Sequence, residues 1–153
     1  MPAVLRRGLR TIFQAISKKI KDNYHEWLQM IRDCSNPKTV NPKGVVSSSF
    51  FAIRNTDKCI VGIIDFRHYL KEDLKDFGHI GYSVVPSERK KGYATEMLSK
   101  ILEYAKLQGL KEVQLVCNTS NIASKKTIIN NQGKSMKIYE HNSKLKEVFI
   151  ITL

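Results

Sequence analysis

The sequence predicts one domain of the α/β (α+β) class, with a mixed, mostly antiparallel twisted sheet that carries helices on both faces. A strongly periodic helix pattern lies between two apolar, strand-like runs near the centre of the chain. Pairs of strand-like runs joined by turn-rich links lie before and after this unit, and they predict hairpins. A chain of 153 residues is long enough to bury one core, so we treat residues 1–153 as a single domain.

The first predicted element is an amphipathic helix over about residues 9–32, in which apolar residues recur at helical spacing through Trp27 and Ile31. The first twenty residues carry five cations and no acid, which is also typical of an organellar transit peptide. The periodicity continues well past a removable segment, so a structural helix is the favoured interpretation and a transit peptide the alternative. The helix ends near Pro37, because proline cannot continue it.

Two strands over residues 48–54 and 59–66 follow, and the turn-forming link of residues 55–58 predicts that they form an antiparallel hairpin. A charged connection over residues 67–77, with a short turn of helix, leads to a strand over residues 79–85.

The central helix is predicted over residues 91–107, with Gly109 as its C-terminal cap. The remaining elements are a strand over residues 112–117, a helix over residues 122–130 closed by Gly133, and a hairpin of strands over residues 135–140 and 146–152. A strand-helix-strand connection is right-handed and joins parallel strands, so we expect the strands on either side of the central helix to be parallel.

Residues 86–94, Pro-Ser-Glu-Arg-Lys-Lys-Gly-Tyr-Ala, are the most informative stretch of the chain. They follow a strand and open a helix, where unpaired N–H groups and the helix dipole favour an anion. Three consecutive cations add positive charge, and Gly92 lets the backbone approach a ligand. We therefore predict a site for a phosphorylated ligand. A solvated charged turn with a tight-turn glycine is the structural alternative.

Three segments carry a resemblance to a known family: Arg89-Lys90-Lys91-Gly92-Tyr93-Ala94, Asn121-Ile122-Ala123-Ser124 and Gly78-His79-Ile80-Gly81-Tyr82-Ser83-Val84. With their strand and helix context, they resemble the GCN5-related N-acetyltransferase (GNAT) family, in its bacterial branch of predicted acetyltransferases. The family's motifs are Arg/Gln-x-x-Gly-x-Gly/Ala for acetyl-CoA and a downstream Asn-x-x-Ala/Ser. The resemblance implies the GNAT fold, with residues 46–153 as the CoA-binding core. Residues 1–45 match weakly and form a helical N-terminal region, and the family's first strand is missing there or replaced by the helix.

The resemblance implies acetyl-CoA as the acyl donor and no metal. The pyrophosphate would lie on amides at the helix start, and the pantetheine arm would pair with the strand backbone around Val84 and Val85. The Val85 amide would be the oxyanion donor for the thioester carbonyl. For Asn121 and Ser124, a role as helix caps alone is the alternative. The implied cofactor-binding residues are Val84, Val85, Arg89, Lys90, Lys91, Gly92, Tyr93, Ala94, Thr95, Asn121 and Ser124.

The residues for catalysis are less clear from the sequence. The resemblance implies direct attack of an amine on the thioester in a ternary complex. The tyrosine that often protonates the leaving thiolate is replaced by Ile128. His79 is the candidate base, because the family often places a glutamate or histidine on the strand before the motif, although a core or surface histidine is the alternative. Further candidates are His68, Asp65, Tyr82 and Tyr139.

The charge balance favours an anionic ligand. The chain has 26 Lys and Arg against 14 Asp and Glu, a net charge of +12. No aromatic-basic recognition motif accompanies the charge, so we do not expect nucleic acid as the main partner. No apolar run approaches the roughly 18 residues of a membrane span. Three scattered cysteines without metal-ligand spacing suggest thiols in a reducing cytoplasm.

These observations predict a cytoplasmic N-acetyltransferase that transfers an acetyl group from acetyl-CoA to a primary amine of a small molecule, peptide or protein. The alternatives are an acyl-CoA-binding sensor or interaction module of the same fold and, with less support, a basic nucleic-acid-binding protein. The sequence leaves the acceptor and a homodimer open.

Overall fold

The computed structural model describes residues 24–153. Every strand and helix predicted after residue 46 is present, with its ends moved by at most two residues. Most of the predicted opening helix lies outside the described residues, and its last part is α2. The elements in chain order are α2 (Tyr24–Cys34), β1 (Ser47–Ile53), β2 (Ile60–Arg67), η1 (Glu72–Leu74), β3 (Ile80–Val84), η2 (Pro86–Glu88), α3 (Tyr93–Leu107), β4 (Glu112–Asn118), α4 (Ile122–Asn130), β5 (Lys134–His141) and β6 (Lys144–Thr152).

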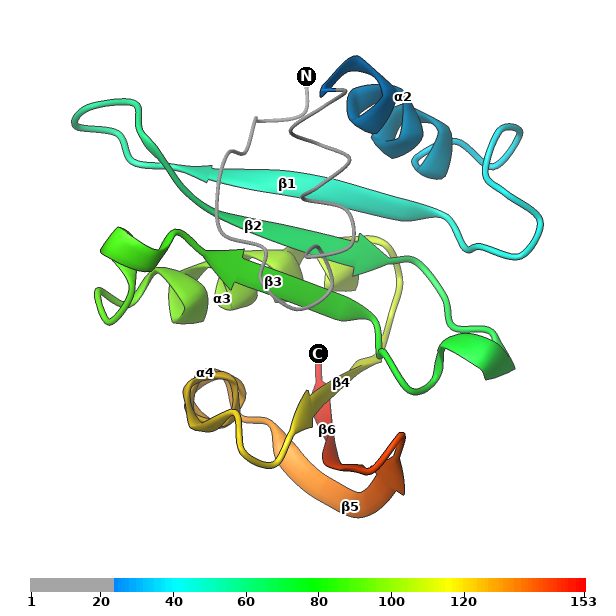
Figure 1. Ribbon diagram of the computed structural model, residues 1–153, viewed down its shortest axis with the longest axis vertical. Coiled ribbons are helices and arrows are strands. Elements are labelled where there is room, and N and C mark those ends of the chain that lie inside the picture. Colours follow the sequence, from blue (N-terminus) through cyan, green and yellow to red (C-terminus); the bar gives the residue numbers. More distant parts are fainter. Residues whose placement is uncertain (1–23) are drawn as a thin grey trace.

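The strands form two three-stranded antiparallel sheets, in the orders β1-β2-β3 and β4-β6-β5 (Figure 1). The prediction of a single mixed sheet with β3 and β4 parallel is therefore wrong in its pairing. Among the described residues, β3 and β4 share no ladder, and one isolated antiparallel bridge joins Gly78 to Leu115. The physical reason lies beside this bridge, where the His79 ring takes the Gln114 N–H that a strand carbonyl would otherwise accept.

Helices cover both faces of the first sheet, as predicted. Alternate residues of β2 point to opposite faces. Ile64 and Phe66 face α3 in the main core, whereas Ile63 packs with Trp27 of α2 on the other side. Phe51 of β1 joins this second cluster, with its ring centroid 6.2 Å from that of Trp27.

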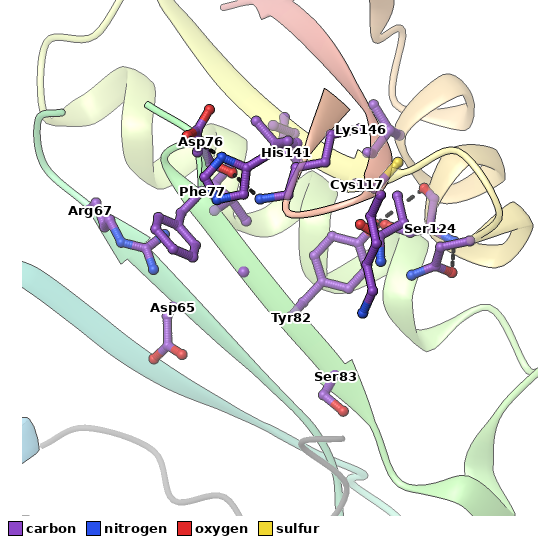
Figure 2. A pocket seen from close by; sticks show the side chains of 18 of the residues that line it. Asp65, Arg67, Asp76, Phe77, Tyr82, Ser83, Cys117, Ser124, His141 and Lys146 are labelled. Carbon is purple, nitrogen blue, oxygen red and sulfur yellow. Dashed lines mark hydrogen bonds and ion pairs between the residues drawn. The ribbon is translucent and has the colours of Figure 1, made fainter. Parts of the chain in front are cut away.

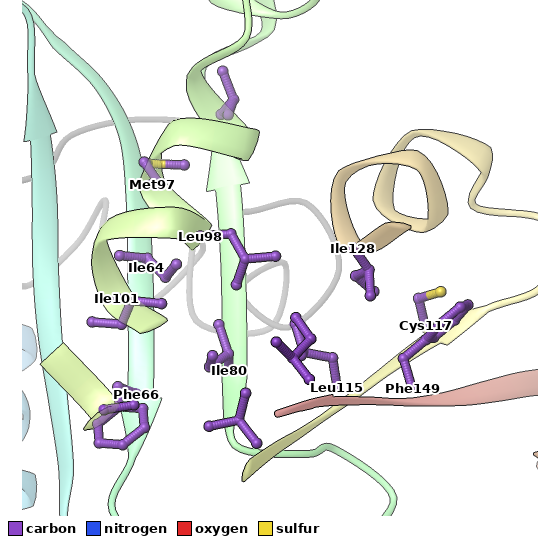
Figure 3. Close-up of a cluster of buried hydrophobic side chains, with 14 residues drawn as sticks. Ile64, Phe66, Ile80, Met97, Leu98, Ile101, Leu115, Cys117, Ile128 and Phe149 are labelled. Carbon is purple, nitrogen blue, oxygen red and sulfur yellow. The ribbon is translucent and has the colours of Figure 1, made fainter. Parts of the chain in front are cut away.

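The main core lies between α3, α4 and the two sheets (Figure 3). Leu98 of α3, Leu115 of β4, Ile128 of α4 and Phe149 of β6 are each at most 1% exposed. Burying a side chain of this size stabilises the fold by about 1.5–3 kcal/mol. Leu115 and Phe149 belong to the second sheet, and Ile64, Phe66 and Ile80 of the same cluster belong to the first, so the core fixes α3 and α4 relative to both sheets.

No helix among the described residues is long and apolar enough to cross a bilayer.

Candidate functional site

The loop between β3 and α3 turns the chain sharply before the helix begins. Lys90 (φ 62°) and Gly92 (φ 85°) both have a left-handed backbone. Gly92 is the N-cap, and its carbonyl accepts the N–H of Glu96 at 3.1 Å. The N–H groups of the three helical residues before Glu96 therefore have no acceptor within the helix. With the helix dipole, they form an anion site at the start of α3.

Gly92 leaves the space in front of this helix start open. A Cβ atom built on Gly92 would meet no atom within 4 Å. Its left-handed backbone also strains any side chain placed there. The glycine thus keeps the backbone amides of Tyr93, Ala94 and Thr95 accessible from outside.

Glu88 pairs with two cations, one from the loop and one from the link after β1. Its Oε2 atom accepts from Arg54 Nη1 at 2.7 Å and from Lys91 Nζ at 3.0 Å. These two partners hold the pKa of the Glu88 carboxyl below its usual value. The exposed side chains of Arg89 and Lys90 remain beside the helix start, and Arg89 Nε donates to the Val84 carbonyl at 3.3 Å. Arg54, from the link after β1, was not predicted, because no local motif marks it.

Strands β3 and β4 are close at one end and diverge toward the other (Figure 1). At the closed end, His79 N–H donates to the Gln114 carbonyl at 2.7 Å, and Gln114 N–H donates to His79 Nδ1 at 2.9 Å. Beyond these two hydrogen bonds, the facing edges of the two strands line a cavity of about 540 Å³. A narrow linear ligand can therefore enter between the strands.

The register of β3 decides which of its backbone groups face this opening. Val85 N–H donates to the Val61 carbonyl of β2 at 2.9 Å, so the odd residues of β3 point their backbone groups at β2. The expectation that the Val85 amide is a free oxyanion donor is therefore wrong. Tyr82 and Val84 sit in the alternate pairs, and their N–H and C=O groups face away from β2.

The start of α4 closes the cavity on the side of the main core. The Asn121 side chain accepts the Ser124 N–H at 3.2 Å, so it caps the helix. The Ser124 hydroxyl lies 2.9 Å from the Tyr82 hydroxyl, across the opening (Figure 2). Burial raises the pKa of Tyr82 to about 12. Ile128, the position of the family's tyrosine, is buried in the core.

Cys117 lines the same cavity but is not a nucleophile candidate. Burial raises the pKa of its thiol, which therefore stays protonated.

His79 does not have the geometry of the predicted base. Its Nδ1 is held by the Gln114 N–H, and the residue is not among those that line the cavity. Desolvation, the largest cause, lowers the pKa of the ring. In this arrangement His79 joins β3 to β4 through its hydrogen bonds with Gln114. His68 is also engaged elsewhere, with Nε2 2.9 Å from the Ser48 hydroxyl.

A polar cluster at the other end of the cavity was not predicted as a unit (Figure 2). Asp76 Oδ1 accepts from the Tyr139 hydroxyl at 2.5 Å, and Oδ2 pairs with His141 Nδ1 at 3.0 Å. The Tyr139 hydrogen bond, the largest cause, holds the pKa of Asp76 below its usual value. Lys146 Nζ donates to the Asp76 carbonyl at 3.3 Å. These residues are far apart in sequence, so no spacing rule could have joined them.

No three potential metal ligands among residues 24–153 lie close enough together to hold an ion.

Comparison with known proteins decides the family. The family model described as "Acetyltransferase (GNAT) domain" matches residues 10–131. The chain belongs to the GNAT family. The anion site at the start of α3 and the divergence of β3 from β4 therefore lie in a GNAT domain.

The relatives agree with this assignment. An uncharacterized N-acetyltransferase of Bacillus subtilis, YnaD, is 34% identical over 83 residues, which are 54% of this chain and 47% of YnaD. The chain thus spans about half the length of this curated relative.

Solved structures share the fold at low sequence identity. A chimera of the Vibrio cholerae spermidine N-acetyltransferase SpeG with hSSAT is 12% identical, with a TM-score of 0.65 over 97% of this chain and 96% of that one. YncA of Salmonella typhimurium, a putative acetyltransferase solved with acetyl-CoA, is 12% identical, with a TM-score of 0.61 over 86% of this chain and 72% of that one.

Proposed function

We propose that the protein is an acetyl-CoA-dependent N-acetyltransferase that acetylates a primary amine. One observation carries the proposal. The open anion site at the start of α3 follows β3 after a short loop, and the backbone edge of β3 at Tyr82 lines the opening toward β4. A ligand with a phosphorylated end and a narrow polar arm fits this combination. The acetyl-CoA in the structure of YncA supports the choice of ligand.

The cofactor would lie with its pyrophosphate on the amides of Tyr93, Ala94 and Thr95, between the side chains of Arg89 and Lys90. The pantetheine arm would then pair with the backbone of Val84 as an added strand would. Tyr82 is two residues deeper, about 6.6 Å along the strand. Its N–H, rather than that of Val85, would then be the oxyanion donor for the thioester carbonyl.

The reaction is a direct transfer. The neutral amine nitrogen attacks the thioester carbon, the carbon–sulfur bond breaks, and the sulfur leaves as a thiolate. The nitrogen loses its extra proton to solvent, and the thiolate is protonated by solvent. A Tyr82 hydroxyl with a pKa of about 12 stays protonated. By turning from the Ser124 carbonyl, which accepts from it at 3.2 Å, this hydroxyl would donate a hydrogen bond that stabilises the leaving sulfur.

The test is thiol release by the full chain with acetyl-CoA and a panel of primary amines that includes spermidine, amino acids and peptides. We expect thiol release that needs an amine and saturates in acetyl-CoA, with an equal amount of acetylated product by mass spectrometry. Saturable acetyl-CoA binding without release for any amine would instead support the sensor alternative, which the apolar Ile128 favours. Absence of binding at sub-millimolar acetyl-CoA would overturn both.

A further inference from the structure

Arg67 is a half-buried cation at the end of the cavity that also carries Asp76 and His141, which we call the acceptor end (Figure 2). Its Nη1 atom donates to the Gly78 carbonyl at 2.9 Å. Among the described residues, the guanidinium forms no ion pair. Arginine has five N–H donors, so most of them remain for another acceptor. Asp65, two residues away on the same face of β2, attracts the guanidinium without a direct ion-pair contact, so the remaining donors are available to an anion in the cavity.

The charges around Arg67 leave this end of the cavity positive. Lys144 and Lys146 also line it, against the two carboxylates of Asp65 and Asp76. The Asp76 carboxylate already accepts from the Tyr139 hydroxyl and pairs with His141. The Asp65 carboxylate accepts from the Ser49 hydroxyl at 2.5 Å. A polycation would meet three cations and two engaged carboxylates here.

The cavity connects Arg67 with the proposed thioester position. Gly81, opposite Asp65 in the ladder, has no side chain to separate Arg67 from the edge of β3 at Tyr82. Alternation puts Arg67 and Asp65 on the face of the first sheet opposite α3. CoA would enter beside the start of α3, so the acceptor would approach from the opposite face, where α2 packs on Ile63 and Arg67 lies at the cavity end of β2.

We propose that the acceptor amine carries an anionic group, a carboxylate or a phosphate, that Arg67 binds while the amine reaches the thioester. The inference rests on the proposed function and names its substrate class. Lys146 supplies a second positive charge at the rim.

The experiment uses matched pairs of amines: β-alanine against propylamine, 2-aminoethyl phosphate against ethanolamine, and a peptide with an acidic second residue against its amide counterpart. Spermidine is the polycationic probe. We expect a higher kcat/KM for the acidic member in at least one pair. Arg67→Gln keeps a donor for Gly78 but loses the charge-assisted bond, so it should lower that kcat/KM about 10- to 100-fold, mainly through KM. The kcat/KM for the neutral member should change little. The control Lys106→Gln, on the exposed face of α3, should leave kcat/KM unchanged for both members.

If Arg67 has only a structural role, Arg67→Gln should lower kcat/KM equally for both members of a pair. That result, or equal or better use of the neutral amines or spermidine, would overturn the inference. Saturation-transfer NMR of the same pairs on the CoA-bound protein gives a second measurement that does not need turnover. If CoA binds but no amine releases thiol, the proposed function fails, while selective, Arg67-dependent binding of the acidic members still supports the acceptor class and unselective binding contradicts it.

Discussion

At the scale of single residues, the site differs from the family pattern at position 128. Ile128 is 1% exposed and packs in the main core, so it can offer no proton donor to a leaving thiolate. A hydroxyl reaches the start of α4 from the other side of the opening instead, on Tyr82 of β3. The sequence revealed the loss at Ile128 and offered Tyr82 only as one of several candidates, because the contact between Tyr82 and Ser124 joins residues 42 positions apart.

Tyr82→Phe should therefore lower kcat about tenfold or more, because a hydrogen bond to a charged group contributes about 1.5–3 kcal/mol. Acetyl-CoA affinity should stay unchanged. Because burial raises the pKa of Tyr82 to about 12, this hydroxyl should cause no loss of rate up to about pH 10. The measurement is steady-state thiol release across pH. Tyr69→Phe, outside the cavity, is the control, and an unchanged kcat in Tyr82→Phe would refute the role.

His79 makes a prediction about stability rather than rate. Its pKa is lowered in the folded state, chiefly by desolvation, so the unfolded chain binds the proton more readily. The neutral His79 ring therefore contributes its full stabilisation above the pKa of the unfolded state, about 6.5. This contribution is lost as the pH falls below that value. We expect urea unfolding to show lower stability at pH 5.5 than at pH 7.5, and His79→Gln to weaken this dependence. Between pH 7.5 and 9 the free energy of unfolding should follow the same trend in the original chain and in His79→Gln. An equal drop in this free energy at low pH in both proteins would exclude His79 as its cause.

At the scale of elements, the type and position of each strand and helix after residue 46 could be predicted, because periodicity and turn residues are local signals. The relation between β3 and β4 could not. The handedness rule predicts parallel neighbours, but the His79 side chain accepts the Gln114 N–H and the strands diverge beyond it. A side chain that takes the place of a backbone carbonyl leaves no pattern in the sequence.

The junction of the two sheets depends on the close approach of Gly78 to β4. A Cβ atom there would lie 2.6 Å from the Gln114 carbonyl oxygen, and the backbone is left-handed, with φ +69°. Gly78→Ala should cost about 2–4 kcal/mol from the clash and the strain together. Gly109→Ala is the matched control, because its φ is +87° and its Cβ would meet nothing within 4 Å. It should cost about 1 kcal/mol, from strain alone. Equal costs in urea unfolding would contradict the described junction.

At the scale of the whole molecule, the site combines elements from most of the described chain. The loop proposed to bind the cofactor is recognisable in the sequence because its cations and glycine lie within one short segment. The proposed acceptor end is not, since Arg67, Asp76 and His141 come from three separate segments that only the fold brings to one cavity. The net charge of +12 suits both an anionic cofactor and an acceptor with an acidic group.

The most direct test of the cofactor site is calorimetric titration of acetyl-CoA into three proteins: the original chain, Gly92→Glu and Gly109→Glu. Both glycines have a left-handed backbone and open space for a side chain, so the two substitutions cost similar strain. They differ in position, because Gly92 begins α3 and Gly109 follows its end. We predict that Gly92→Glu abolishes acetyl-CoA binding while the fold, checked by circular dichroism, is kept, and that Gly109→Glu binds as the original chain does. Unchanged affinity in Gly92→Glu would contradict the placement of the CoA pyrophosphate at the start of α3.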